Sequence, residues 1–154
     1  VLAVSRSKPG RKELRIENRP ILGAIELGPN EGADARRQAR AAARFGGALT
    51  LVHVARPVPE LPGITPELDQ NRQLARIGER LARLARRVGA RSRVVPGAPE
   101  DQIVAVANDI NAGLIILSLR RGRGLLGPRR GTTTYRILSG SSTPVLALPP
   151  IGRM

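Results

Sequence analysis

The sequence predicts an α/β fold: an open, mostly parallel five-stranded sheet with helices on both faces. Short apolar runs alternate with longer helical patterns, which is the arrangement of repeated strand–helix–strand units. The 154 residues suffice for one domain with a sizeable core. Hydrophobic residues make up 41% of the chain but aromatic residues only 1%, so the core must be built from Val, Leu, Ile and Ala.

Two helices are predicted in the first half of the chain. Residues 33–45 are rich in Ala and Arg, and a pair of glycines stops that helix. Thr65 and Pro66 form a good N-cap and first-turn pair for the second helix. Behind them apolar residues recur at steps of three and four and form one face, until Gly89 ends the helix. These residues are Leu74, Ile77, Leu81, Leu84 and Val88.

A third helix is predicted to open at Pro99. Its buried stripe has helical spacing and consists of Ile103, Val106, Ala107 and Ile110. Each predicted helix follows a predicted strand. Right-handed crossovers between parallel strands would therefore distribute the helices over both faces of the sheet.

The segment from residue 114 to residue 148 is the most informative. The apolar run 114–117 predicts a buried strand, and a loop of glycines and arginines follows it. That loop ends at residues 131–134, a helix-like piece covers residues 135–138, and Val145–Leu148 predicts a closing strand. A strand that leads into a basic, glycine-rich loop and then a helix N-terminus is suited to holding an anion, because free backbone N–H groups and the helix dipole both favour negative charge.

Candidate binding residues lie at the predicted strand exits. In open parallel sheets, ligands bind beyond the carboxyl ends of the strands, at the point where strand order reverses. Glu26, Val54 and residues 118–121 all occupy such exits. We therefore expect them to border one cleft.

The segment after residue 114 resembles the C-terminal part of the universal stress protein domain, where a loop of pattern G-x2-G-x9-G-[S/T] wraps the ribose and phosphates of ATP. The last pair of that pattern falls on Gly131 and Thr132. The first two glycines fall on Ser118 and Arg121, so the spacing fits but two glycines are replaced. The run Val145–Leu148 is similar to the closing strand of the family.

The resemblance extends over residues 20–149. Residues 21–26 are similar to the first strand of the family, and Glu26 stands where the family usually carries an Asp near the adenine. Residues 49–54 are similar to the second strand, and residues 97–100 to the third-strand exit and the next helix start. The resemblance implies a universal stress protein-like domain at residues 20–150, with the Rossmann-like fold that is shared with the adenine-nucleotide alpha hydrolases.

This family likeness implies a stress-response protein that binds ATP or another adenine nucleotide, with Mg²⁺ if the nucleotide is ATP. Glu26 and Val54 would border the base and ribose. The ribose and phosphates would be bordered by Leu117, Ser118, Arg121, Gly131, Thr132 and Thr133. The alternative is a nucleotide-free interaction or regulatory module, because Arg121 stands where a side chain can block the approach of backbone to phosphate.

Residues 1–19 do not fit the domain. They begin with an apolar run and then turn basic and polar. Residues 1–4 echo the closing strand Val145–Leu148, so one hypothesis is that they end a preceding copy in a tandem and that residues 5–19 form the linker. An extra edge strand is the other interpretation.

The net charge is +14, from 26 basic and 12 acidic residues. Nucleic-acid binding is one interpretation, and solvated helix faces in an arginine-rich protein are the other. With one Tyr, one Phe and no Trp, the chain lacks the stacking platforms of single-strand binders, so we expect no specific nucleic-acid function. Arginines concentrated in the loop could clamp a triphosphate. They are Arg120, Arg121, Arg123, Arg129 and Arg130.

We expect no enzyme. His53 is the only histidine and lies inside an apolar run, which favours a structural role. The sequence contains no Ser-His-Asp set, metal-ligand cluster or Walker motif. Without cysteines, a targeting signal or an apolar run long enough to span a membrane, the chain is expected in the cytoplasm.

A homodimer is expected through the closing strand. As a terminal strand, Val145–Leu148 would lie at a sheet edge, which must be paired or covered. The resemblance implies that this strand pairs with its twin across a two-fold axis. Residues 1–4 would compete for the same edge.

Overall fold

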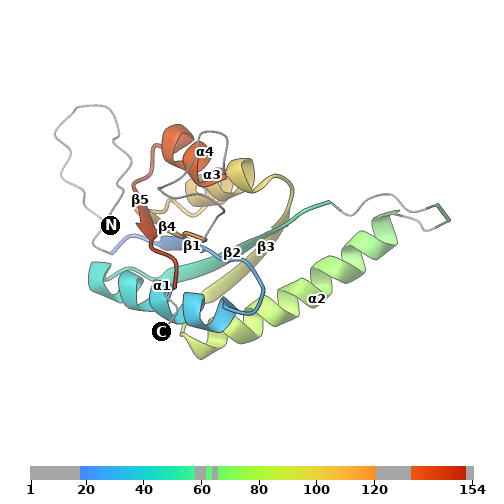
Figure 1. The fold of residues 1–154 in the computed structure, drawn as a ribbon, viewed down its shortest axis with the longest axis horizontal. Coiled ribbons are helices and arrows are strands. Elements are labelled where there is room, and N and C mark those ends of the chain that lie inside the picture. The colour runs from blue at the N-terminus through green and yellow to red at the C-terminus, as the bar shows by residue number, and fades with distance from the viewer. Residues whose placement is uncertain (1–17, 58–61, 64–65, 121–132, 152–154) are drawn as a thin grey trace.

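The computed structural model describes residues 18–57, 62–63, 66–120 and 133–151 (Figure 1). The expected site residues Arg121, Gly131 and Thr132 lie outside these ranges, as do residues 1–17. Nine elements alternate along the described chain. The strands are β1 (Ile21–Ala24), β2 (Leu49–Ala55), β3 (Arg91–Pro96), β4 (Leu114–Ser118) and β5 (Val145–Leu148). The helices are α1 (Glu31–Phe45), α2 (Pro66–Arg87), α3 (Pro99–Asp109) and α4 (Thr133–Gly140).

The five strands form one sheet in the order β3-β2-β1-β4-β5, and every neighbouring pair is parallel. The chain moves outward from β1 to β3 and then returns to the other side of β1 for β4 and β5. Strand order therefore reverses between β1 and β4. In register, Ala24 of β1 lies between Val52 of β2 and Leu117 of β4. The predicted fold class is confirmed.

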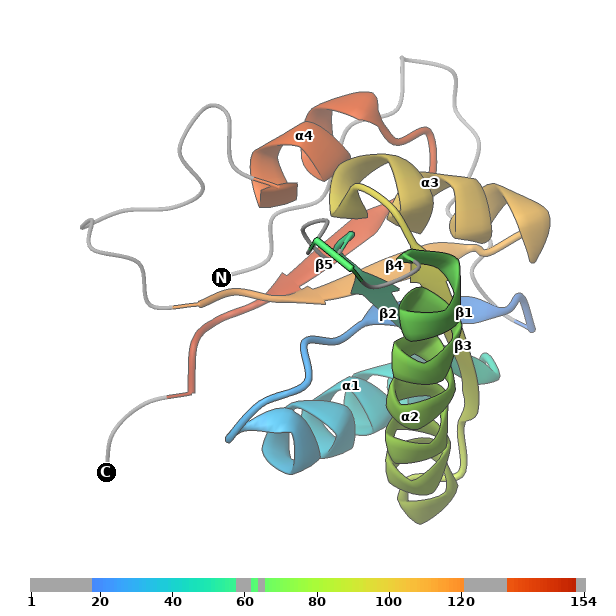
Figure 2. The ribbon, with the colours of Figure 1, turned by 90° about the vertical axis from the view of Figure 1, so that its right-hand side faces the viewer.

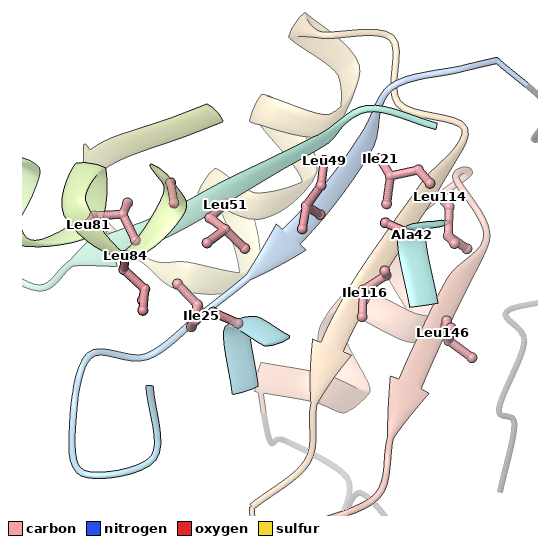
Figure 3. Packing of buried hydrophobic residues seen from close by; sticks show 12 residues of the cluster. Ile21, Ile25, Ala42, Leu49, Leu51, Leu81, Leu84, Leu114, Ile116 and Leu146 are labelled. Atoms are coloured by element: carbon pink, nitrogen blue, oxygen red, sulfur yellow. The ribbon is translucent and has the colours of Figure 1, made fainter. Parts of the chain in front are cut away.

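The helices cover the two faces of the sheet in pairs. Figure 2 shows α1 and α2 below the sheet and α3 and α4 above it. The cluster between the sheet and helices α1 and α2 contains Ile21, Leu51 and Leu81. All of its buried members are aliphatic (Figure 3). A second cluster, with Ile103, Ile115 and others, fills the space under α3 and α4. Alternation of side chains along each strand supplies both cores. None of the described helices is long and apolar enough to cross a membrane.

Several boundaries differ from the sequence-based expectation; α4, for example, covers Thr133–Gly140 and not only residues 135–138. Strand β1 ends at Ala24, so Glu26 lies in the exit loop, not on the strand. Helix α1 begins at Glu31, two residues earlier than expected. The Glu31 carboxylate accepts a hydrogen bond from the Gly28 backbone N–H at 3.0 Å, and its own N–H donates to the Gly28 carbonyl, so this turn extends the helix N-terminally. At the other end, Gly46 has φ +71° and closes α1 as predicted.

The two edges of the sheet differ in chemistry. Edge strand β3 exposes Arg91, Ser92, Arg93 and Pro96. Charged residues and proline are devices that discourage another strand from pairing at an edge. Edge strand β5 has the sequence VLAL and carries neither device. Within the described residues, β5 pairs with β4 alone.

Candidate functional site

Gln38 joins the two strand ends at the point where strand order reverses. It lies on the inward face of α1 and is fully buried. Its Nε2 donates a hydrogen bond to the Ala24 carbonyl at 2.8 Å and another to Ser118 Oγ at 3.2 Å. Ala24 and Ser118 are the last residues of β1 and β4. A single side chain from α1 therefore fixes the spacing between the two exits.

The close approach of Gln38 requires a glycine on β1. A Cβ at Gly23 would lie 2.2 Å from Gln38 Oε1 and 3.1 Å from Leu49 Cδ1. Gln38 Oε1 is buried and has no hydrogen-bond partner among the described residues. It lies against the Gly23 Cα, where only a weak C–H···O contact is available. Gly23 and Gln38 thus act as one packing unit.

Glu26 and Arg120 form an ion pair across the two exits. Glu26 follows the end of β1 by two residues, and Arg120 follows the end of β4 by two residues. The pair joins Glu26 Oε2 to Arg120 Nη2, and the side chains are 61% and 67% exposed, respectively. Solvent screening limits such a pair to at most about 1 kcal/mol. The pair is therefore weak enough to exchange for a ligand.

His53 of β2 helps to hold the exit of β1. Its Nδ1 lies 3.0 Å from the carbonyl oxygen of Ile25. A carbonyl can only accept a hydrogen bond, so in this contact Nδ1 carries the proton. The Ile25 backbone N–H donates to the Val52 carbonyl at 2.9 Å, which extends the link between the two strands. His53 has a structural partner, in keeping with the role that its place in an apolar run suggested.

Three of the expected site residues, Glu26, Val54 and Leu117, lie at the carboxyl ends of three neighbouring strands. The register that pairs Ala24 with Val52 brings Val54 level with the exit loop at Glu26. Leu117 belongs to the apolar cluster between the sheet and helices α3 and α4, where it is 5% exposed, and the partly buried Val54 packs against this cluster.

Ser118 behaves differently. Its hydroxyl accepts the hydrogen bond from Gln38 of α1, so it points to the opposite face of the sheet from Leu117. Period-2 alternation from Leu117 would have predicted this direction. The Ser118 side chain, at the position where the resembling family has glycine, therefore takes up no space on the side of the sheet that α3 and α4 cover. Thr133 begins α4 and is half-buried.

An ion pair between α3 and α4 was not expected from the sequence. Arg136 Nη1 donates to Glu100 Oε1 at 2.8 Å. The pKa of Glu100 is lowered from its ordinary value of 4.5, mainly by a hydrogen bond from its own backbone N–H. Burial opposes this lowering, and Arg136 adds to it. Arg56, at the exit of β2, contributes a further lowering of this pKa. Glu100 is thus held charged at the first turn of α3.

One sequence signal could have revealed Gln38. It interrupts the buried alanine stripe of α1, between Ala35 and Ala42, at helical spacing. A polar residue in such a stripe must find partners inside the protein. The Glu100–Arg136 pair has no comparable signal, because the two residues are 36 positions apart.

The described residues contain no group of three His, Cys, Asp or Glu side chains that could hold a metal ion. The described part of the expected site consists of the Glu26 carboxylate, the aliphatic side chains of Val54 and Leu117, backbone groups at the strand ends and the nearby Arg120. These groups can bind a polar, anionic ligand.

The solved structures similar to this chain include universal stress proteins. A universal stress protein in complex with cAMP has a TM-score of 0.64 and 19% identity, with 86% of this chain and 98% of that chain covered. The protein from Archaeoglobus fulgidus in complex with dAMP has a TM-score of 0.52 and 19% identity, with 84% and 96% covered. The UspA protein from Lactobacillus plantarum has a TM-score of 0.64 and 18% identity, with 88% and 99% covered.

At such identities the likeness establishes the fold alone. None of the curated proteins matches the chain. The sequence model of the universal stress protein family matches residues 17–149, which is most of the chain and agrees with the extent of the resemblance. The protein therefore belongs to the universal stress protein family.

Proposed function

We propose that this protein binds an adenine nucleotide at the carboxyl ends of β1 and β4 and acts in the stress response by binding, without catalysis. The observation that carries the proposal is the reversal of strand order between these two strands. Ligands of open parallel sheets bind at such a point. The family membership and the relatives whose structures contain cAMP or dAMP support an adenine nucleotide as the ligand.

The base and ribose would lie beside Glu26 and Val54. The Glu26 carboxylate accepts hydrogen bonds and can exchange Arg120 for a polar group of the ligand, since their pair is exposed and weak. Val54 supplies aliphatic surface at the same level of the sheet. Leu117 is buried, so it would offer its backbone groups and not its side chain.

The phosphates would lie toward the start of α4. Thr133 begins this helix, and no acidic residue occupies its first turn. The positive end of the helix dipole therefore remains available to an anion. By the family resemblance, Arg121, Gly131 and Thr132 would add backbone and guanidinium contacts, and Mg²⁺ would accompany ATP.

Calorimetric titration with ATP and Mg²⁺, and separately with AMP and cAMP, tests this proposal. The variants are Glu26→Gln in the exit loop and Gly131→Asp, which would place a carboxylate at the expected phosphate position. Glu79→Gln is the matched control, because Glu79 is an exposed carboxylate on α2. Micromolar binding that both site variants weaken at least tenfold, and the control leaves unchanged, is the expected result. Absence of heat with all three nucleotides in the wild-type protein would contradict the proposal.

A nucleotide-free interaction module is the second candidate. One observation favours it: the residue that would face the base already has a partner in Arg120. In that case the same titration gives no heat with the wild-type protein.

The proposal includes a homodimer through β5. This edge carries no charged residue or proline within the strand, whereas the β3 edge is protected. Pairing of β5 with its twin across a two-fold axis would satisfy the outward backbone groups of both strands.

A further inference from the structure

Eight exposed arginines lie on the outward faces of α1 and α2. These two helices cover the same face of the sheet (Figure 2), and Glu31 of α1 joins Arg80 of α2 by an ion pair at 2.7 Å. We name the outward surface of the two helices the arginine face. Its arginines are Arg36, Arg40, Arg44, Arg72, Arg76, Arg83, Arg86 and Arg87.

The helical spacing aligns these residues into rows. On α1 the three arginines follow one another at steps of four, opposite the buried Ala35 and Ala42. On α2 the five arginines lie on the side of the helix opposite the buried Leu81. The α2 row spans 15 residue steps, or about 22 Å at 1.5 Å per residue.

None of the eight arginines forms an ion pair with another described residue, since the ion pairs there use Arg37, Arg80, Arg93, Arg120 and Arg136. From position 72 to the end of α2, Glu79 is the one carboxylate. Like charges at steps of three or four destabilise a helix by a few tenths of a kcal/mol for each pair. Such rows therefore cost stability unless an anion neutralises them.

The distribution of charge argues against a uniform excess of arginine. Helices α1 and α2 together carry ten arginines and five carboxylates. Helices α3 and α4, on the opposite face of the sheet, carry one arginine and three carboxylates. A compositional bias alone would place arginines on every solvated helix surface. Among the four described helices, the surplus is confined to α1 and α2.

The chemistry of the arginine face selects its partner. Guanidinium groups bind phosphate oxygens through paired, charge-assisted hydrogen bonds. A membrane-bound surface helix usually adds large apolar anchors, but the exposed large hydrophobic residues of the described chain are Tyr135 and Ile151, neither on α1 or α2. The face also lacks aromatic side chains for stacking on single-stranded bases.

A rigid, regular array of phosphates therefore fits best. The α2 row of about 22 Å matches the rise of about six base pairs at 3.4 Å each. We propose that the arginine face binds the phosphate backbone of double-stranded nucleic acid without reading its sequence. This interaction is separate from the proposed nucleotide site, which lies at the ends of β1 and β4.

Fluorescence anisotropy with a labelled DNA duplex of mixed sequence tests the inference. The test variant is Arg76→Gln with Arg83→Gln, and the control is Arg56→Gln with Arg91→Gln. Both remove two exposed arginines that form no ion pair with a described residue, but the control pair lies outside the two helices, with Arg56 directly after β2 and Arg91 at the start of β3. Glutamine is a good helix former, so the test variant should keep the fold.

The test variant is expected to weaken duplex binding about tenfold and to lower the slope of log affinity against log salt by about 1.8, or 0.9 for each lost phosphate contact. The control should stay within about twofold of wild type. A competing duplex of unrelated sequence should displace the probe fully. Three results would overturn the inference: no duplex binding at low salt, equal loss in the control, or tighter binding to vesicles containing phosphatidylglycerol than to the duplex.

Discussion

Gly23 of β1 and Gln38 of α1 share one space: a Cβ on Gly23 would come within 2.2 Å of Gln38 Oε1. Two hydrogen bonds to the ends of β1 and β4 hold the Gln38 amide, so it cannot move aside without losing them. The glycine is therefore required by a helix that packs on the sheet and not by a turn.

The substitution Gly23→Ala should destabilise the protein by about 1–3 kcal/mol, the usual cost of overpacking a core. In a Gln38→Ala background most of this cost should disappear, because the clashing amide is gone. Urea denaturation of the two single variants and the double variant measures the coupling. Gly78→Ala is the control, since nothing lies within 4 Å of a Cβ there and alanine favours the helix. Equal costs of Gly23→Ala in both backgrounds would show that Gln38 is not the cause.

Arg120→Gln should raise the affinity for adenosine up to about fivefold. The substitution releases Glu26 from an exposed ion pair worth at most about 1 kcal/mol, so the carboxylate no longer has to give up a partner. Thermal stability should hardly change for the same reason. Adenosine, which has no phosphate, is the proper probe, because Arg120 could also contact phosphates. Weaker adenosine binding in this variant would mean that Arg120 supports the site and does not compete with the ligand.

Glu100→Gln should lower thermal stability at neutral pH, and by less at an acidic pH below the ordinary value of 4.5. The folded-state pKa of Glu100 is lowered, so its contribution is present above the unfolded value and is lost as the pH falls through the folded value. The gap between wild type and variant should therefore narrow on acidification. Melting temperatures at both pH values provide the measurement. Asp101→Asn is the comparison, since this neighbour has no ion pair with a described residue. A gap that stays the same at low pH would assign the effect to packing.

Ala147→Pro should convert the proposed dimer into a folded monomer. The carbonyls of Pro144 and Leu148 accept hydrogen bonds from Ile115 and Leu119, so every second residue of β5 faces β4. The Ala147 N–H consequently points to the free edge, where proline is tolerated. Light scattering reports the mass, and circular dichroism confirms the fold. Ala147 is itself buried, so circular dichroism must show that the variant is folded; at Val145, which is larger and fully buried, a substitution would test core packing instead. A folded Ala147→Pro dimer would place the interface elsewhere.

Most elements of the fold were predictable because their signals are local, whereas the exposed edge strand β3 has no aliphatic run and only its exit was expected, from the family resemblance. Aliphatic runs marked the buried strands. Gly46 marked the end of α1 because glycine readily adopts the left-handed conformation that commonly ends a helix, and the structure shows this conformation there. The strand exits, and with them Glu26 and Val54, followed from the rule that parallel strands end at one side of a sheet.

The contacts at those exits depend on residues far apart in the chain. Gln38 and Ser118 are 80 positions apart, and no local pattern pairs them. The same holds for Glu26 and Arg120, which meet only because strand order reverses between β1 and β4. The arginine face likewise required knowledge of which helices lie side by side.

The unequal edges of the sheet have a consequence for assembly size. A receptive edge on both sides would let copies add one after another into a growing ribbon. With Arg91, Arg93 and Pro96 on the β3 edge, only the β5 edge can accept a strand. Two-fold pairing of β5 would use the receptive edge of both copies at once, so association through the sheet would stop at two. The number of subunits is then limited by the charged residues and the proline of β3, the edge strand farthest from the proposed β5 interface.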